Sequence, residues 1–170
     1  MSAPPRGPVG PTRVERIVSG GQTGVDRAAL DVALEGGIPA GGWCPRGRRA
    51  EDGRIPHRYP LQETNSSGYP ERTRRNVSGS DATLILTRGP IKGGTALTVR
   101  LASRLGRPLL VVDLDHAVAD DVRSWIARHG IEVLNVAGPR ENEHPGIGRQ
   151  ARTFLAVVLG VMVPTGDVDR

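Results

Sequence analysis

The sequence predicts a single α/β domain built on a doubly wound parallel sheet of about five or more strands, with helices on both faces. Two observations predict it. The length of 170 residues fits one compact domain. Short runs of Val, Leu and Ile alternate with helical patterns, and such unbroken apolar runs are typical of parallel strands covered on both sides. We expect this ligand-binding domain at residues 13–163, between a disordered N-terminal tail at 1–12 and a C-terminal tail at 164–170.

The first elements are a strand, a glycine-rich turn and a helix in direct succession. The strand is expected at 14–19 and the turn at 20–24. Apolar residues then recur at spacings of three and four, as on one face of a helix: Val25, Ala28, Ala29, Val32 and Ala33. Gly36 and Gly37 provide a typical helix end. A short second strand is expected at 38–43, followed by about thirty residues without periodicity, and connections of that length are usually functional.

The second half repeats the alternation, including a second glycine-rich turn at 92–95. The expected elements are a short helix at 71–77, a strand at 82–87, a helix ending at Gly106, a strand at 109–112, a helix at 120–129, a strand at 131–136 and a last helix after Pro145. We take the expected strand order as 2-1-3-4-5, in which the order reverses between the first and third strands.

Ligands of open parallel sheets bind beyond the carboxyl ends of the strands, where the strand order reverses. The two glycine turns follow the first and third strands, so both are expected at that place. Glycine permits close approach of the backbone, and each turn opens a helix whose free N–H groups favour an anion. The candidate ligand-binding residues are Gly20, Gly21, Gln22, Thr23, Gly24, Lys92, Gly93, Gly94, Thr95 and Arg140. No catalytic residue and no metal ligand are predicted.

Each feature also has a purely structural interpretation. Thr23 and Asp26 have the spacing of a capping box, which would satisfy the start of the first helix locally. Neither turn matches a phosphate-loop or dinucleotide fingerprint, so the ligand hypothesis rests on there being two turns at neighbouring strand ends. Arg140 is either a ligand-binding residue or a surface ion-pair partner of Glu141 or Glu143. Trp43 either stacks on a planar ligand or packs in the core, and core packing is favoured.

Charge and composition restrict the function classes. The net charge is +5 and the isoelectric point about 10.5, yet aromatic residues make up only 3%, which disfavours a nucleic-acid platform. Residues 46–75 hold eight arginines against four acidic residues, and their role stays open. The single cysteine, Cys44, excludes an internal disulfide, and the four histidines lack metal-ligand spacing. The longest apolar run, 154–163, is too short for a membrane span, and 1–12 lacks a signal-type hydrophobic stretch, so a cytoplasmic protein is expected.

Five segments together resemble the putative molybdenum carrier family: Ser19–Arg27 (SGGQTGVDR), Gly41–Pro45 (GGWCP), Ser80–Thr83 (SDAT), Lys92–Thr95 (KGGT) and Gly138–Glu141 (GPRE). The resemblance covers roughly residues 14–160, and the second glycine turn is shared with the wider lysine-decarboxylase-like superfamily. It implies a Rossmann-like homo-oligomer, a dimer or tetramer. Such a protein would hold molybdenum cofactor (molybdopterin), molybdate or a related nucleotide without transforming it, and would deliver the cofactor to a molybdoenzyme acceptor.

One position departs from the hydrolase relatives of that superfamily. Those enzymes carry a glutamate three residues after the threonine of the second glycine turn, and this chain has Thr98 there. Threonine has no carboxylate for acid–base chemistry, so a binding protein is favoured over an enzyme. Two other hypotheses remain: a nucleotide or phosphosugar hydrolase that uses Asp26, Glu63 or Glu71 instead, and a nucleotide-sensing module whose assembly changes on binding.

Overall fold

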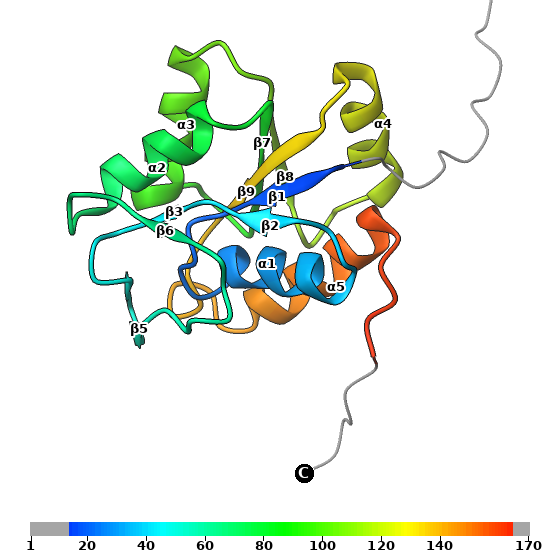
Figure 1. Cartoon of the computed structure of the whole chain (residues 1–170). Coiled ribbons are helices and arrows are strands. Elements are labelled where there is room, and N and C mark those ends of the chain that lie inside the picture. Colours follow the sequence, from blue (N-terminus) through cyan, green and yellow to red (C-terminus); the bar gives the residue numbers. More distant parts are fainter. Residues whose placement is uncertain (1–13, 165–170) are drawn as a thin grey trace, which may run out of the picture.

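A computed structural model describes residues 14–164 and shows a five-stranded parallel sheet in the order β2-β1-β9-β7-β8 (Figure 1). The predicted doubly wound α/β fold is confirmed. From one edge to the other the strands are β2 (Ala40–Gly41), β1 (Arg16–Val18), β9 (Val133–Ala137), β7 (Ala82–Thr87) and β8 (Leu109–Asp113). Every neighbouring pair is parallel.

The predicted strand order is wrong at one place. The last strand, β9, lies between β1 and β7, so the order counted along the chain is 2-1-5-3-4 rather than 2-1-3-4-5. Leu134, Asn135 and Val136 in β9 are buried, as a central strand requires, whereas Val111 in the edge strand β8 is exposed. In the sequence the edge run 109–112 is wholly apolar, whereas 131–136 contains Glu132 and Asn135, so apolar content did not indicate which strand is central.

Helices cover both faces of the sheet (Figure 1). The helix α1 (Val25–Glu35) packs against α5 (Ile147–Leu159), and α5 also contacts α4 (Ala119–His129). On the opposite face α2 (Tyr69–Ser78) packs against α3 (Gly93–Arg104). The large apolar core lies under α1, α4 and α5. By contrast, the buried side chains of α2 and α3 are mostly polar, so the second face is the one suited to a polar site.

The segment after β2, which has no sequence periodicity, is ordered. It contains two small ladders: β3 (Trp43–Cys44) pairs with β6 (Gln62–Glu63), and β4 (Arg49–Ala50) pairs with β5 (Gly53–Arg54). Gly42, at φ +130, separates β2 from β3 and divides the strand expected at 38–43. Arg48 is buried and donates to four backbone carbonyls of residues 55–61, which fixes the loop without regular structure.

The remaining boundaries agree with the expected ones to within a few residues, and α2 begins at Tyr69 rather than Glu71. The tails expected at 1–12 and 164–170 lie outside the described residues, apart from Pro164. None of the helices in the described part of the chain has the length and apolar character that a bilayer crossing needs.

Candidate functional site

Both glycine turns line one small pocket at the carboxyl ends of β1, β9 and β7. The cavity has a volume of about 140 Å³. Gly20 and Gln22 line it from the first turn, and Gly94 and Thr95 from the second. Because β9 lies between β1 and β7, the segment that follows β9 lines the same pocket through Gly138 and Arg140. Three strand ends therefore meet here; the sequence predicted the two that carry the glycine turns and gave Arg140, after the last strand, as a further candidate.

The glycines of the first turn make room for the protein itself. A Cβ on Gly20 would overlap the guanidinium of Arg72, which donates an N–H to the Gly20 carbonyl at 2.9 Å. A Cβ on Gly21, at φ +78, would lie 2.5 Å from a methyl of Leu61. At Gly24, at φ +80, it would lie 2.5 Å from the carbonyl oxygen of Pro139. These glycines are explained by internal packing and by the positive φ at two of them.

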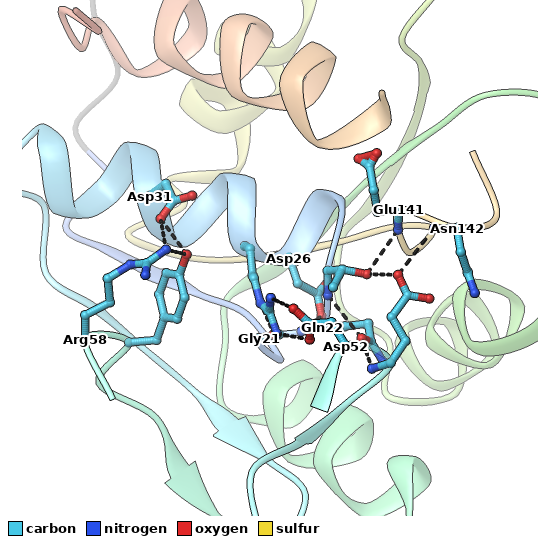
Figure 2. Close-up of polar contacts among 12 residues, drawn as sticks. Gly21, Gln22, Asp26, Asp31, Asp52, Arg58, Glu141 and Asn142 are labelled. Atoms are coloured by element: carbon cyan, nitrogen blue, oxygen red, sulfur yellow. Dashed lines mark hydrogen bonds and ion pairs between the residues drawn. The ribbon is translucent and has the colours of Figure 1, made fainter. Parts of the chain in front are cut away.

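The next side chains of the first turn face two different ways. Gln22 lines the pocket; its Oε1 accepts the N–H groups of Thr23 and Glu51, and its buried Nε2 has no partner among residues 14–164. Thr23 and Gly24 line a broader hollow on the other side of the turn. There the Thr23 hydroxyl bonds Glu51 and accepts the N–H of Glu141 (Figure 2). Of the donors expected from this turn, only Gln22 lines the pocket.

The capping-box interpretation of the first turn is wrong in its partners. The N-cap of α1 is Gly24, and no side chain caps it. Asp26 accepts the N–H of Gln22 at 3.2 Å rather than pairing with Thr23. The Thr23 hydroxyl is engaged with the loops that carry Glu51 and Glu141.

The second glycine turn is open. A Cβ on Gly94 would meet nothing within 4 Å, and the start of α3 has no side-chain cap. Thr95 is buried on the pocket wall, and Lys92 is exposed and not part of it. Thr98 also lines the pocket, and its hydroxyl donates to the Gly94 carbonyl at 3.0 Å. The start of α3 thus has no side-chain cap and borders a space that no side chain fills.

Charged side chains complete the pocket wall. Asp26 is buried with an oxygen 4.0 Å from the Arg72 guanidinium, and burial raises the pKa of Asp26 to about 6 although Arg72, Arg27 and Arg140 oppose the shift. Arg140 lines the pocket, and its Nε lies 3.7 Å from Glu143, so the expected ion pair is present and ligand binding by Arg140 stays a prediction. The guanidinium groups of Arg72 and Arg140 therefore border the pocket, and the carboxyl group of Asp26 on the same wall is buried away from water.

Sequence reasoning missed five polar residues of the wall: Tyr69, Arg72, Thr73, Asn76 and Asn135. Asn135 was detectable, because a polar residue inside the apolar run 131–136 is unusual; its amide donates to the Thr83 hydroxyl at 3.2 Å. The other four come from α2, and all but Asn76 lie within the arginine-rich segment 46–75, whose role was open. No spacing rule links that segment to the glycine turns.

The Trp43–Cys44 pair lies outside the pocket. The guanidinium of Arg75 stacks over the Trp43 ring at 4.5 Å, and Asn76 bonds both backbone groups of Trp43. Cys44 is buried, and burial raises the pKa of its thiol, so the group stays protonated at neutral pH. Within residues 14–164 no three His, Cys, Asp or Glu side chains gather closely enough to hold a metal ion.

These features define a class: a Rossmann-like α/β protein with a small polar pocket where glycine turns follow its central parallel strands. Comparison with known proteins then identifies the family. The model of the circularly permutated YpsA SLOG family matches residues 17–159, and the chain belongs to that family.

The chain is also similar to a protein of known structure. The crystal structure of a putative molybdenum carrier protein from Syntrophus aciditrophicus SB, at 1.45 Å resolution, is 47% identical, with a TM-score of 0.84. The match covers 87% of this chain and 96% of that one. No curated protein matches the chain. The resemblance to the molybdenum carrier family inferred from the sequence is confirmed.

Proposed function

We propose that this protein binds molybdenum cofactor by its phosphate group and carries it, the pocket between the two glycine turns being the phosphate site. The observation that carries the proposal is the open start of α3 at Gly94, which faces the same cavity as Arg72 and Arg140. Free helical N–H groups and paired guanidinium groups are the donors that phosphate and related oxyanions prefer. The name of the similar crystal structure supports molybdenum as the cargo.

Two details favour an oxygen-rich guest. The buried Nε2 of Gln22 is a donor without a partner among the described residues, and such groups are costly unless a ligand or water satisfies them. The absence of a side chain at Gly94 leaves a space open that any larger residue would occupy. At about 140 Å³ the cavity is smaller than typical pockets for whole cofactors, so it suits the phosphate end, with the pterin lying outside it. Gln22, Gly94, Thr95 and Arg140 would hold that end.

A nucleotide or phosphosugar hydrolase is the second candidate, and one observation favours it. Of the acids proposed for it from the sequence, Asp26 lines the pocket. Glu63 instead accepts the N–H of Gly47, and Glu71 pairs with Arg75. A buried carboxyl with a pKa of about 6 is suited to proton transfer near neutral pH. Incubation with nucleoside monophosphates tests this function, and release of free base would replace the carrier proposal.

The carrier proposal is tested by anaerobic isothermal titration with molybdenum cofactor, molybdate and adenosine monophosphate. We expect saturable binding of the cofactor and weaker binding of molybdate. Gly94→Asp should abolish binding, because it places a carboxylate in the open pocket without a backbone clash. Ser103→Asp, which adds the same charge to an exposed position of α3, is the matched control. Absence of heat with every probe, or full affinity in Gly94→Asp, would refute the proposal.

We further propose a cytoplasmic dimer or tetramer that passes the cofactor to a molybdoenzyme. Leu105, Val111 and Val118, near the β8 edge, are 44%, 42% and 53% exposed, which supports association through that edge. Sedimentation with and without a nucleotide measures the assembly. A change of assembly on binding would instead favour the sensing module.

A further inference from the structure

Three arginines surround the ring of Tyr69 at the edge of the pocket. The guanidinium carbons of Arg49, Arg72 and Arg140 lie 5.7, 5.1 and 5.4 Å from the ring centroid. We call these three arginines and Tyr69 the arginine collar. Arg72, Arg140 and Tyr69 also line the pocket, and Arg49 does not, so the collar extends from the pocket wall outward.

The charges of the collar are poorly neutralised. The carboxylate oxygens paired with Arg72 and Arg140 are at 4.0 Å (Asp26) and 3.7 Å (Glu143), beyond hydrogen-bond distance. Arg49 donates to a backbone carbonyl, that of Ser67, at 2.9 Å, and has no acidic partner within 4.0 Å among residues 14–164.

Some arginines elsewhere in the described part of the chain have closer acidic partners than those of the collar. Arg27 holds both carboxylate oxygens of Asp52, one of them at 2.7 Å (Figure 2), and Arg123 bonds Asp120 at 2.8 Å. The collar therefore concentrates positive charge that the protein itself does not neutralise.

The collar is also arranged in advance. Guanidinium groups that stack on an aromatic ring keep their edge N–H groups available for a bidentate contact with phosphate. Tyr69 is the first residue of α2, whose N-terminus has no side-chain cap, so the positive end of that helix lies at the collar too. Like charges are held together here before any ligand arrives, and an anion between them would relieve their repulsion.

We infer that the arginine collar is a second anion subsite, so that the ligand carries two adjacent phosphates, one in the glycine pocket and one at the collar. This inference rests on the proposed function, since it adds a subsite to the same pocket. It assigns the ligand to the diphosphate-bearing class, such as a nucleotide-conjugated cofactor or a nucleoside diphosphate. It also gives the arginine-rich segment 46–75 a role, because Arg49, Tyr69 and Arg72 all come from it.

The test compares inorganic phosphate with pyrophosphate by isothermal titration at fixed pH and ionic strength. We expect the parent protein to bind pyrophosphate at least about tenfold more tightly than phosphate. Arg49→Gln should remove most of this ratio and change phosphate affinity less than about twofold. Arg54→Gln, which removes the same charge from an exposed position of the same loop, should keep the ratio.

The ring is tested separately from the charge. Tyr69→Phe keeps the aromatic face and should keep the ratio, whereas Tyr69→Leu should lower it. If phosphate binds but pyrophosphate binds no more tightly, or if Arg49→Gln leaves the ratio unchanged, the second subsite is refuted and the first stands. If the parent binds neither anion, the proposed function itself is refuted.

Discussion

The two glycine turns look alike in the sequence but differ in what surrounds them. In the first turn, Arg72, Leu61 and Pro139 occupy the space that side chains at Gly20, Gly21 and Gly24 would need. In the second turn, side chains at Gly93 and Gly94 would meet nothing within 4 Å.

The same sequence signal thus has two physical origins. Glycine in the first turn lets strands and loops pack closely, and glycine in the second leaves open space at the start of α3. Tight packing around the first turn determines the shape of the pocket wall, and the second turn leaves the pocket open beside Gly94. Substitution of single glycines should separate these roles.

The largest effect is expected from Gly24→Ala. The added methyl would lie 2.5 Å from the Pro139 carbonyl oxygen at a φ of +80, so the backbone of the first turn or of the segment after β9 must shift. We expect a loss of about 3 kcal/mol in the free energy of unfolding, measured by urea denaturation. A loss below about 1 kcal/mol would show that the surrounding backbone moves aside at little cost. The first turn would then not be more tightly packed, in energetic terms, than the second.

An intermediate effect is expected from the buried acid beside the first turn. The pKa of Asp26 is raised from 3.8 to about 6, so the folded state binds a proton that the unfolded state releases. This contribution to stability is present below pH 4 and is lost as the pH rises through 6. Asp26→Asn removes this loss. Relative to the parent, the variant should gain about 2 kcal/mol in the free energy of unfolding between pH 4.5 and 7.5.

Comparing the two proteins at each pH cancels the other titrating groups. One of these is Asp52, whose pKa is lowered by its hydrogen bond to Arg27 and which acts in the opposite direction. A difference that does not change with pH would mean that Asp26 is ionised throughout this range in the folded protein.

The smallest effect on stability is expected from Gly94→Ala. Alanine is favoured over glycine inside a helix, and the methyl meets no atom within 4 Å, so the variant should be about 0.5 to 1 kcal/mol more stable than the parent. The same methyl enters the proposed phosphate site and should weaken phosphate binding about tenfold. If Gly94→Ala is more stable than the parent and binds phosphate with the same affinity, the anion binds at another place.

Much of the fold was predictable because its signals are local. The run 82–87 is a strand with exactly those bounds, and Val25 and the apolar residues after it form the expected helix. The meeting of the two glycine turns also follows from a general rule about parallel strand ends. What the pattern did not contain was the position of β9, since the edge run 109–112 is wholly apolar and the run 131–136 is interrupted by Glu132 and Asn135.

The site was predicted in part for a similar reason. Gln22, Gly94, Thr95 and Arg140 were inferred from turns that follow strands, and all four line the pocket. Arg72 and Tyr69 come from a separate helix, across a loop held by Arg48 and its bonds to backbone carbonyls. Such contacts depend on where an irregular loop lies in space, and no periodicity encodes that.

The central position of β9 has a consequence for synthesis of the chain. During translation β1 with β2, and β7 with β8, are made well before residues 133–137 leave the ribosome, and neither pair borders the other without β9. At ordinary elongation rates the nascent chain waits roughly a few seconds with two unjoined half-sheets and their open edges. The last central strand thus closes the molecule in one late step, and a ribosome stalled before residue 133 should hold a chain that chaperones recognise.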